Sequence, residues 1–178
     1  MSFSKSAAGV VAVLAVLLLS APNASASCSG ADATASQASR RALVRATLCV
    51  VNAERARHDL RRLRLNRSLS TAARRHSRAM VRGQFFSHDS AGGASFVDRI
   101  RSSGYLSGAS SWYVGENIAY GSGDRSSARS IATAWMKSRP HRANILSPSF
   151  REIGIGVASG TPVGSRGATY TTDFGQRS

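Results

Sequence analysis

The chain has 178 residues, a length typical of a single domain, and a formal net charge of +15. Nearly all of the positive charge is arginine, which favours anionic partners such as acidic cell-wall polymers or lipid headgroups. The arginines, for example Arg55, Arg57 and Arg61, are scattered along several segments without interleaved aromatic residues. This pattern predicts a solvated basic surface and argues against a nucleic-acid-binding protein.

Residues 1–26 are typical of a secretory signal peptide, with Lys5 near the start, an apolar run over 7–19 and Ala24-Ser25-Ala26 at the end. The apolar run is too short for a stable membrane span. We therefore expect a secreted, extracellular protein, with association with the cell envelope left open. The predicted mature chain has an N-terminal arm over 27–40 and one domain over 41–178, and we expect a monomer.

The predicted mature chain contains two cysteines, Cys28 and Cys49. In an oxidising compartment, such a pair most simply forms one disulfide, which would tie the arm to the first helix. Two free thiols are the alternative.

Apolar residues at helical spacing predict helices over 39–58 and 68–82, the second ending at Gly83. His76 lies on the apolar face of the second helix, so we expect a core histidine with a hydrogen-bond partner. His58 lies among arginines at the end of the first helix, so we expect it to be solvated.

The middle of the chain predicts a loop over 85–93, a short helix over 96–103 and a strand over 113–120. A helix over 126–138 follows, with Asp124 as its N-cap and Ile131, Ala134 and Trp135 on its inner face.

Alternating residues predict two late strands, over 151–157 and 168–174. In the first, Gly154 and Gly156 share one face, which would let a helix approach the sheet closely. Because helices come first and strands mostly late, we expect an α+β fold with helices packed on an antiparallel sheet.

Glu116 shares a strand face with Val114 and Ile118, so its carboxylate is expected to face the interior. A buried carboxylate is costly unless it is paired, and histidine is an obvious partner. The sequence has no G-x-S-x-G nucleophile elbow, no H-E-x-x-H zinc motif and no Walker loop.

Five segments occur in a recognisable order: FSHDS at 86–90, GENIAYG at 115–121, AWMKSRPHRANIL at 134–146, EIGIGVA at 152–158 and YTTDFG at 170–175. Together they resemble the bacterial, SCP-like branch of the CAP superfamily, which comprises cysteine-rich secretory proteins, antigen 5 and pathogenesis-related 1 proteins. The resemblance covers residues 48–175 and implies a three-layer α-β-α sandwich with a central, mainly antiparallel sheet.

The resemblance also implies a cleft lined by His88, Glu116 and His141. Some members of the superfamily bind zinc or another divalent cation through the two histidines, which would make His88 and His141 metal ligands here. His141 would begin a short helix over 140–146, where the helix dipole favours a neutral imidazole ring.

The sequence departs from the superfamily pattern at two positions. Ser138 stands where many relatives carry a second glutamate, and Pro140 replaces the usual glycine before the second histidine. Glu152 is the residue that could replace the missing carboxylate. With one ligand or proton carrier fewer, a metal or acid–base mechanism is weakened.

Three functions remain open. The first is an extracellular binding module for a lipid, a glycan, another anionic cell-envelope ligand or a protein partner. The second is a metal-assisted hydrolase of peptide or cell-wall substrates, in which Glu116 positions a zinc-bound water. In the third, the His/Glu cluster only stabilises the core. We rank binding before a structural role, and catalysis last.

Overall fold

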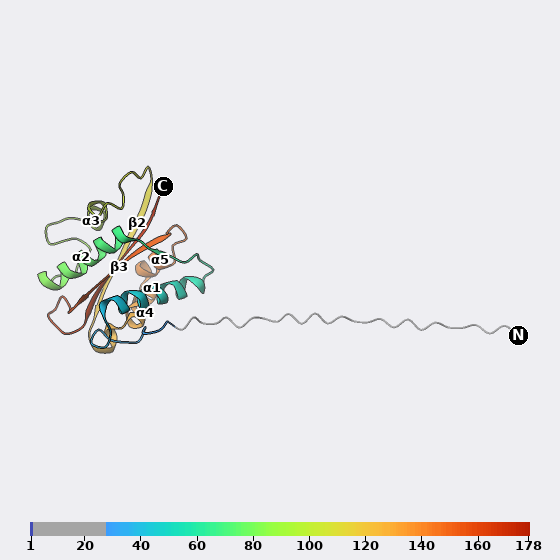
Figure 1. Cartoon of the computed structure of the whole chain (residues 1–178), viewed down its shortest axis with the longest axis horizontal. Helices are drawn as coiled ribbons and strands as arrows, with labels where there is room; N and C mark the ends of the chain where they lie inside the picture. The colour runs from blue at the N-terminus through green and yellow to red at the C-terminus, as the bar shows by residue number, and fades with distance from the viewer. Residues whose placement is uncertain (2–27) are drawn as a thin grey trace.

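The computed structural model describes Met1 and residues 28–178, so most of the predicted signal peptide lies outside the described residues (Figure 1). The helices are α1 (Arg40–Ala56), α2 (Arg67–Gly83), α3 (Phe96–Ser102), α4 (Ala128–Lys137) and α5 (Arg139–Ile145), with a 3-10 turn η1 (Gly123–Ser126). The strands are β1 (Arg64–Leu65), β2 (Trp112–Gly121), β3 (Glu152–Ser159) and β4 (Ala168–Arg177). Among the described residues, none of the helices is long and apolar enough to span a membrane.

The helices begin at polar caps that the sequence supplies. The Ser39 side chain accepts a hydrogen bond from Ala42 N at the start of α1, and the Asn66 side chain caps α2 in the same way. The predicted cap of α4 is wrong, because Asp124 lies inside the η1 turn. The chain becomes extended at Ser127, whose side chain accepts from Ser130 N, so α4 begins there instead.

Helix α2 does not end at a left-handed glycine. It includes Gly83, and the left-handed residue is Gln84, with a φ of 51°. A Cβ on Gly83 would lie 2.9 Å from the Phe85 ring. The glycine therefore makes room for the aromatic residue that follows, while Gln84 turns the chain into the loop.

The four strands form one sheet in the order β1-β3-β4-β2. β2 and β3 each pair with β4 antiparallel, and only the two-residue β1 is parallel to its neighbour β3. One face packs on α2, because a Cβ on Gly154 or Gly156 would lie within 2.4 Å of the α2 backbone. The predicted glycine face is thus confirmed.

The opposite face of the sheet packs on α1, α4 and α5, and Figure 1 shows the sheet running diagonally between α2 on one side and α1 with α4 on the other. The main core lies between these layers and includes Leu43, Trp135, Ile145 and Ile153. Ala134, expected on the inner face of α4, is exposed instead. The predicted α-β-α sandwich with a mainly antiparallel sheet is confirmed.

Arg55 corrects the expectation of a uniformly solvated set of arginines, because its side chain is fully buried. Its guanidinium donates to Arg61 O at 2.8 Å, Ile145 O at 2.7 Å and Ser147 O at 2.9 Å. The last carbonyls of a helix lack partners within the helix, and a cation there is favourable. Arg55 therefore fixes the C-terminal end of α5.

Cys28 and Cys49 form the predicted disulfide, with their Cα atoms 5.6 Å apart. The bond holds residues 28–39 against α1, and Cys28 packs beside Ala128 and Ala132 of α4. The division into an arm over 27–40 and a domain over 41–178 stays a prediction.

Candidate functional site

A buried carboxylate with two cationic or polar partners lies in the middle of β2. Only 1% of the Glu116 side chain is exposed. His88 Nδ1 donates to Glu116 Oε1 at 2.8 Å, and an Nη of Arg99 donates to Glu116 Oε2 at 2.6 Å. Burial raises the pKa of Glu116, but the hydrogen bond from His88 and the charge of Arg99 outweigh it. The pKa therefore lies below its usual value, and Glu116 is a carboxylate.

His88 lies in the loop after α2, and 48% of its side chain is exposed. Because Nδ1 carries the proton donated to Glu116, the neutral ring keeps its lone pair on Nε2. A carboxylate behind a histidine in this way fixes the tautomer and orientation of metal-binding imidazoles.

A second buried carboxyl group faces Glu116 across the sheet. Asp173 is the register partner of Glu116 on β4, and it is 1% exposed. Neither of its oxygens accepts a hydrogen bond from the described residues. Burial and the neighbouring Glu116 raise the pKa of Asp173 well above its usual value. The protonated, neutral form of Asp173 is therefore favoured in the fold, and in that form its hydroxyl can donate to Glu116.

His76 lies on α2 and is 1% exposed, as a core histidine should be. Its Nε2 forms a hydrogen bond with Ser87 O at 2.8 Å, next to His88 in the loop. Burial lowers the pKa of His76, and the charge of Glu116 only partly opposes this. A neutral ring donating to Ser87 O thus holds the loop that presents His88.

His141 lies near the start of α5, and asparagines attach this helix to β2. Asn117 Nδ2 donates to His141 O at 3.0 Å, and Asn144 Nδ2 donates to Glu116 O at 3.1 Å. Burial lowers the pKa of His141, and the nearby His88 ring lowers it further, so the two rings are close enough to interact electrostatically. The structure therefore brings His88, Glu116 and His141 to the same strand, at the β2 edge of the sheet.

A shallow cavity of about 290 Å³ adjoins His141. His141 and Ser138 line it together with Phe86, Tyr120 and Trp135. The rings of Phe86 and Tyr120 meet edge to face, with their centroids 5.0 Å apart. Two of the predicted site residues thus line a cavity whose walls combine aromatic and aliphatic side chains.

Glu152 lies apart from this group. Its Oε1 accepts from Asn66 Nδ2 at 2.8 Å, and its Oε2 accepts from Tyr105 Oη at 2.8 Å. These bonds tie β3 to the start of α2 and to the segment after α3. Glu152 therefore does not supply the carboxylate missing at Ser138.

The prediction that His88 and His141 are metal ligands stays a prediction. In residues 28–178 there is no group of three or more His, Cys, Asp or Glu side chains suitably placed to hold a metal ion. The two imidazoles would need water or a bound ligand to complete the coordination of a cation.

The sequence interpretation missed two members of the cluster, Arg99 and Asp173. Asp173 lies on the same face of β4 as Thr169 and Thr171. This period of two residues could have placed Asp173 beside the buried face of β2. Arg99 gave no comparable signal, because a short helix with several arginines does not show which one meets a carboxylate on a distant strand.

Comparisons with known proteins agree with the fold. Residues 48–173 match the family described as "Cysteine-rich secretory protein family", abbreviated CAP. Two relatives come from Bacillus subtilis strain 168. The protein YkwD is 38% identical over 113 residues, covering 63% of this chain and 41% of YkwD. The membrane protein YlbC is 31% identical over 110 residues, covering 62% of this chain and 30% of YlbC. The chain thus spans less than half the length of each relative.

Solved structures of other bacterial proteins show the same fold. An extracellular SCP-domain protein from Bacillus anthracis superposes with a TM-score of 0.60 at 26% identity, covering 77% of this chain and 43% of that one. An outer surface protein from Borrelia burgdorferi superposes with a TM-score of 0.65 at 16% identity, covering 79% of this chain and 97% of that one. At this low identity, the Borrelia structure shows a similarity of fold alone. With most of its length matched by the family and the predicted sandwich in place, the chain belongs to the cysteine-rich secretory protein (CAP) family.

Proposed function

We propose that the protein is an extracellular binding module. It binds a divalent cation through His88 and His141, and a cell-envelope ligand in the adjoining aromatic cavity. The observation that carries this proposal is the state of Glu116, whose oxygens are held by His88 and Arg99. A carboxylate held in this way orients an imidazole but is poorly placed to take a proton from water.

The cation is expected from the chemistry of the two rings. In a neutral His88 ring, the hydrogen bond from Nδ1 to Glu116 leaves the lone pair on Nε2, and the lowered pKa of His141 favours a neutral ring there. Neutral imidazoles are the form that binds zinc. With two protein ligands, a bound cation would retain open positions and would polarise a ligand oxygen there.

The cavity supports a ligand with both apolar and polar faces. Phe86 and Tyr120 are 47% and 40% exposed, although large aromatic side chains are usually mostly buried. Exposed aromatic rings beside Ser138 and His141 suit a sugar ring, which has apolar C–H faces and hydroxyl edges. A glycan is therefore the ligand class that we favour over a lipid.

A purely structural role is the second candidate, because the bonds among His88, Arg99 and Glu116 also stabilise the fold. The two functions differ in the effect of Glu116→Gln. If Glu116 orients a metal-binding ring, this variant weakens zinc binding by about 10- to 100-fold. If the cluster is only structural, the variant changes the unfolding midpoint without changing zinc affinity.

The test is calorimetric titration of the purified protein with zinc. We expect one bound zinc ion per chain, and at least about tenfold weaker binding in the His88→Ala/His141→Ala double variant. His58→Ala is the matched control, because His58 is an exposed histidine far along the sequence from the cluster. Equal affinity of the double variant and the wild type would refute the metal site.

Ligand binding is tested separately with oligosaccharides of N-acetylglucosamine, followed by NMR. We expect chemical-shift changes centred on Phe86 and Tyr120, and their loss in Phe86→Ala. Shifts that are absent, or that are spread over the whole surface, would count against a glycan ligand in this cavity.

A further inference from the structure

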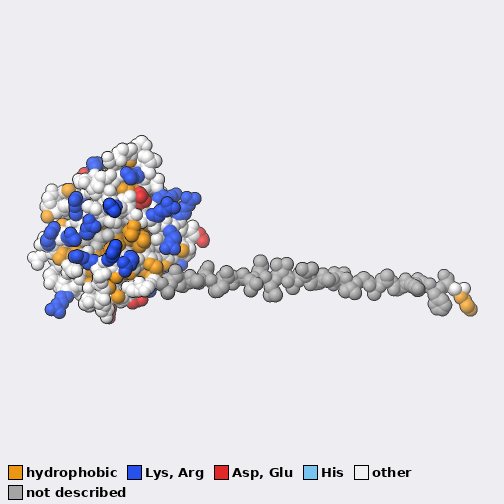
Figure 2. Space-filling model, in the orientation of Figure 1, with side chains coloured by type: hydrophobic (Ala, Val, Ile, Leu, Met, Phe, Trp, Pro, Cys, Tyr) orange, Lys and Arg blue, Asp and Glu red, His pale blue; other side chains and the backbone are white. Residues whose placement is uncertain are grey.

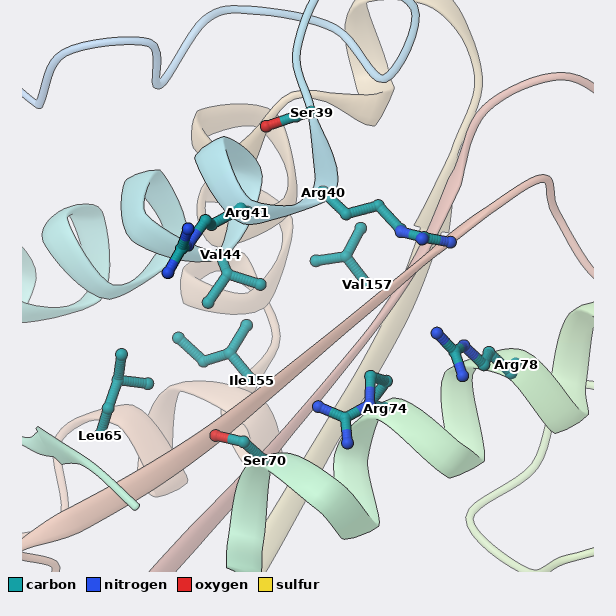
Figure 3. Close-up of a pocket in the computed structure, with 10 residues that line it drawn as sticks. All are labelled: Ser39, Arg40, Arg41, Val44, Leu65, Ser70, Arg74, Arg78, Ile155 and Val157. Carbon is teal, nitrogen blue, oxygen red and sulfur yellow. The ribbon is translucent and has the colours of Figure 1, made fainter. Parts of the chain in front are cut away.

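A second concave site lies at the other edge of the sheet, away from β2. This edge groove has a volume of about 550 Å³ and lies between α1 and α2 (Figure 3). Val44, Ile155 and Val157 contribute apolar surface, and four arginines line it: Arg40 and Arg41 from α1, and Arg74 and Arg78 from α2. Figure 2 shows an apolar patch among clusters of basic side chains on the face of the molecule that carries α1 and α2.

The groove exists because β1 is too short to cover β3. β1 has two residues and pairs only with Glu152 and Ile153, whereas β3 continues to Ser159. Toward β1, Arg151 O accepts from Arg64 N at 3.0 Å and Ile153 O accepts from Asn66 N at 2.9 Å. Past this point, no strand of the described residues pairs with the outer side of β3.

Backbone groups of a strand alternate in direction with a period of two residues. Because the carbonyls of Arg151 and Ile153 point toward β1, the N–H and C=O groups of Ile155 and Val157 point the same way, into the edge groove. Among the described residues, Ile155 and Val157 pair only with β4, on the opposite side of the strand. The two residues are 3% and 4% exposed, so their outward groups lie at the floor of the groove, where an added strand could pair with them.

The arginines of the groove lack acidic partners. None of Arg40, Arg41, Arg74 and Arg78 forms an ion pair with the residues that the structure describes. A second copy of this chain would bring a charge of +15 against them, and residues 2–27 contain no Asp or Glu. Charge therefore favours an acidic partner from another molecule.

The spacing of α2 along β3 matches the spacing of an extended peptide. Gly154 lies against Leu69, and Gly156 lies against Ala73, so two residues of β3 correspond to four residues of α2. Arg74 and Arg78 are also four residues apart, or about 6 Å along the helix. Alternate residues of an added strand are about 6.6 Å apart, so successive side chains on one face would reach successive arginines.

We propose that the edge groove binds an acidic segment of a partner protein in extended conformation, which adds to the sheet as a strand along β3. Ile155 and Val157 pair with the backbone of the segment. Alternate carboxylates meet Arg74 and Arg78 on the α2 side, and the intervening apolar side chains pack near Val44 on the α1 side. Backbone pairing provides the register, and the arginines select the acidic sequence.

The test uses a fluorescein-labelled peptide of about eight residues, in which glutamate alternates with valine, a length of roughly 26 Å when extended. Fluorescence anisotropy measures its binding to the whole protein. We expect the double variant Arg74→Gln/Arg78→Gln to bind at least about tenfold more weakly. The matched control, Arg75→Gln/Arg82→Gln, removes the same charge from α2 outside the groove and should change affinity by about twofold or less.

A second peptide separates strand addition from simple charge attraction. N-methylation of alternate residues removes backbone donors but keeps every carboxylate, so we expect at least about tenfold weaker binding when the methylated edge faces β3. Hydrogen exchange of the Ile155 and Val157 amides should slow in the presence of the unmodified peptide.

Equal binding of the methylated and unmodified peptides, or equally tight binding of inorganic polyphosphate, would reduce the groove to a general anion site and overturn the proposal. The peptide should bind His88→Ala/His141→Ala as it binds the wild type. The outcome is therefore independent of the zinc experiment.

Discussion

Asp173→Asn is expected to stabilise this protein, and to do so more strongly as the pH rises. Asp173 is fully buried beside the Glu116 carboxylate, and burial together with this neighbour raises its pKa well above the usual value. In the unfolded chain, Asp173 ionises near pH 4. Folding instead favours the protonated form of this group to a higher pH, while an asparagine there is neutral at every pH.

The magnitude follows from the proton that Asp173 releases on unfolding. A group whose pKa is raised by folding contributes stability below its unfolded pKa, and this contribution is lost as the pH rises toward the folded pKa. Between these two values, the free energy of unfolding falls by about 1.4 kcal/mol per pH unit. The advantage of Asp173→Asn should therefore grow as the pH rises above about 4, by at most about 1.4 kcal/mol per pH unit, until the folded pKa is reached. The pKa of Glu116 is lowered, so its own titration lies below this window.

The assay is urea unfolding of the wild type and the variant at several values between pH 5 and pH 7. Asp98→Asn is the control, because the Asp98 carboxylate is exposed and hydrogen bonds with Ser95 lower its pKa. Its effect on the free energy of unfolding should therefore be the same at every pH in this range. A constant difference for Asp173→Asn as well would show that Asp173 is ionised in the folded protein. The assignment of a neutral acid beside Glu116 would then be wrong.

Two further substitutions test how the site and the sheet are held. Arg99→Met removes the cation bonded at 2.6 Å to Glu116 Oε2, and breaking such a buried pair should lower the free energy of unfolding by about 3–5 kcal/mol. Gly156→Ala would put a Cβ 2.3 Å from the backbone of Ala73, so α2 must move away from the sheet, at a cost of about 3 kcal/mol or more. Urea unfolding at neutral pH measures both.

Matched controls accompany these variants. Arg101→Met removes an exposed arginine from the same helix as Arg99, and it should leave the urea midpoint nearly unchanged. Gly92→Ala adds a methyl group where no other atom lies within 4 Å, and it should be tolerated. A loss in either control equal to that of its partner variant would mean that Glu116 and the α2 contact are not the causes.

Local patterns were enough to predict the elements and one buried charge. Alternation along residues 113–120 predicted that Glu116 faces the interior, and the structure shows it 1% exposed. The predicted N-cap of α4 was wrong. Asp124 is a cap-forming residue, but it lies in the 3-10 turn, and Ser127 caps the helix instead. Capping depends on where the chain turns, and a list of cap-forming residues does not determine this.

The partners of the charged groups could not be predicted in this way. Glu152 was a candidate for the cleft, yet it binds Asn66 and Tyr105. Arg55 was expected on the surface, yet it is buried against the last carbonyls of α5. In each case the residue and its partner are on different elements, so spacing along the chain carries no information about their contact.

By itself, the sequence determined the α+β class, the close approach of α2 at Gly154 and Gly156, the pairing of its two cysteines and the interior position of Glu116. These follow from side-chain periodicity, residue size and cysteine number, which are properties of short stretches of chain. Only the tertiary structure decided that Arg99 and Asp173 accompany Glu116, and that β1 stops short and leaves the edge of β3 open between arginines. These features depend on which elements meet in space, and that is set by the packing of the whole domain.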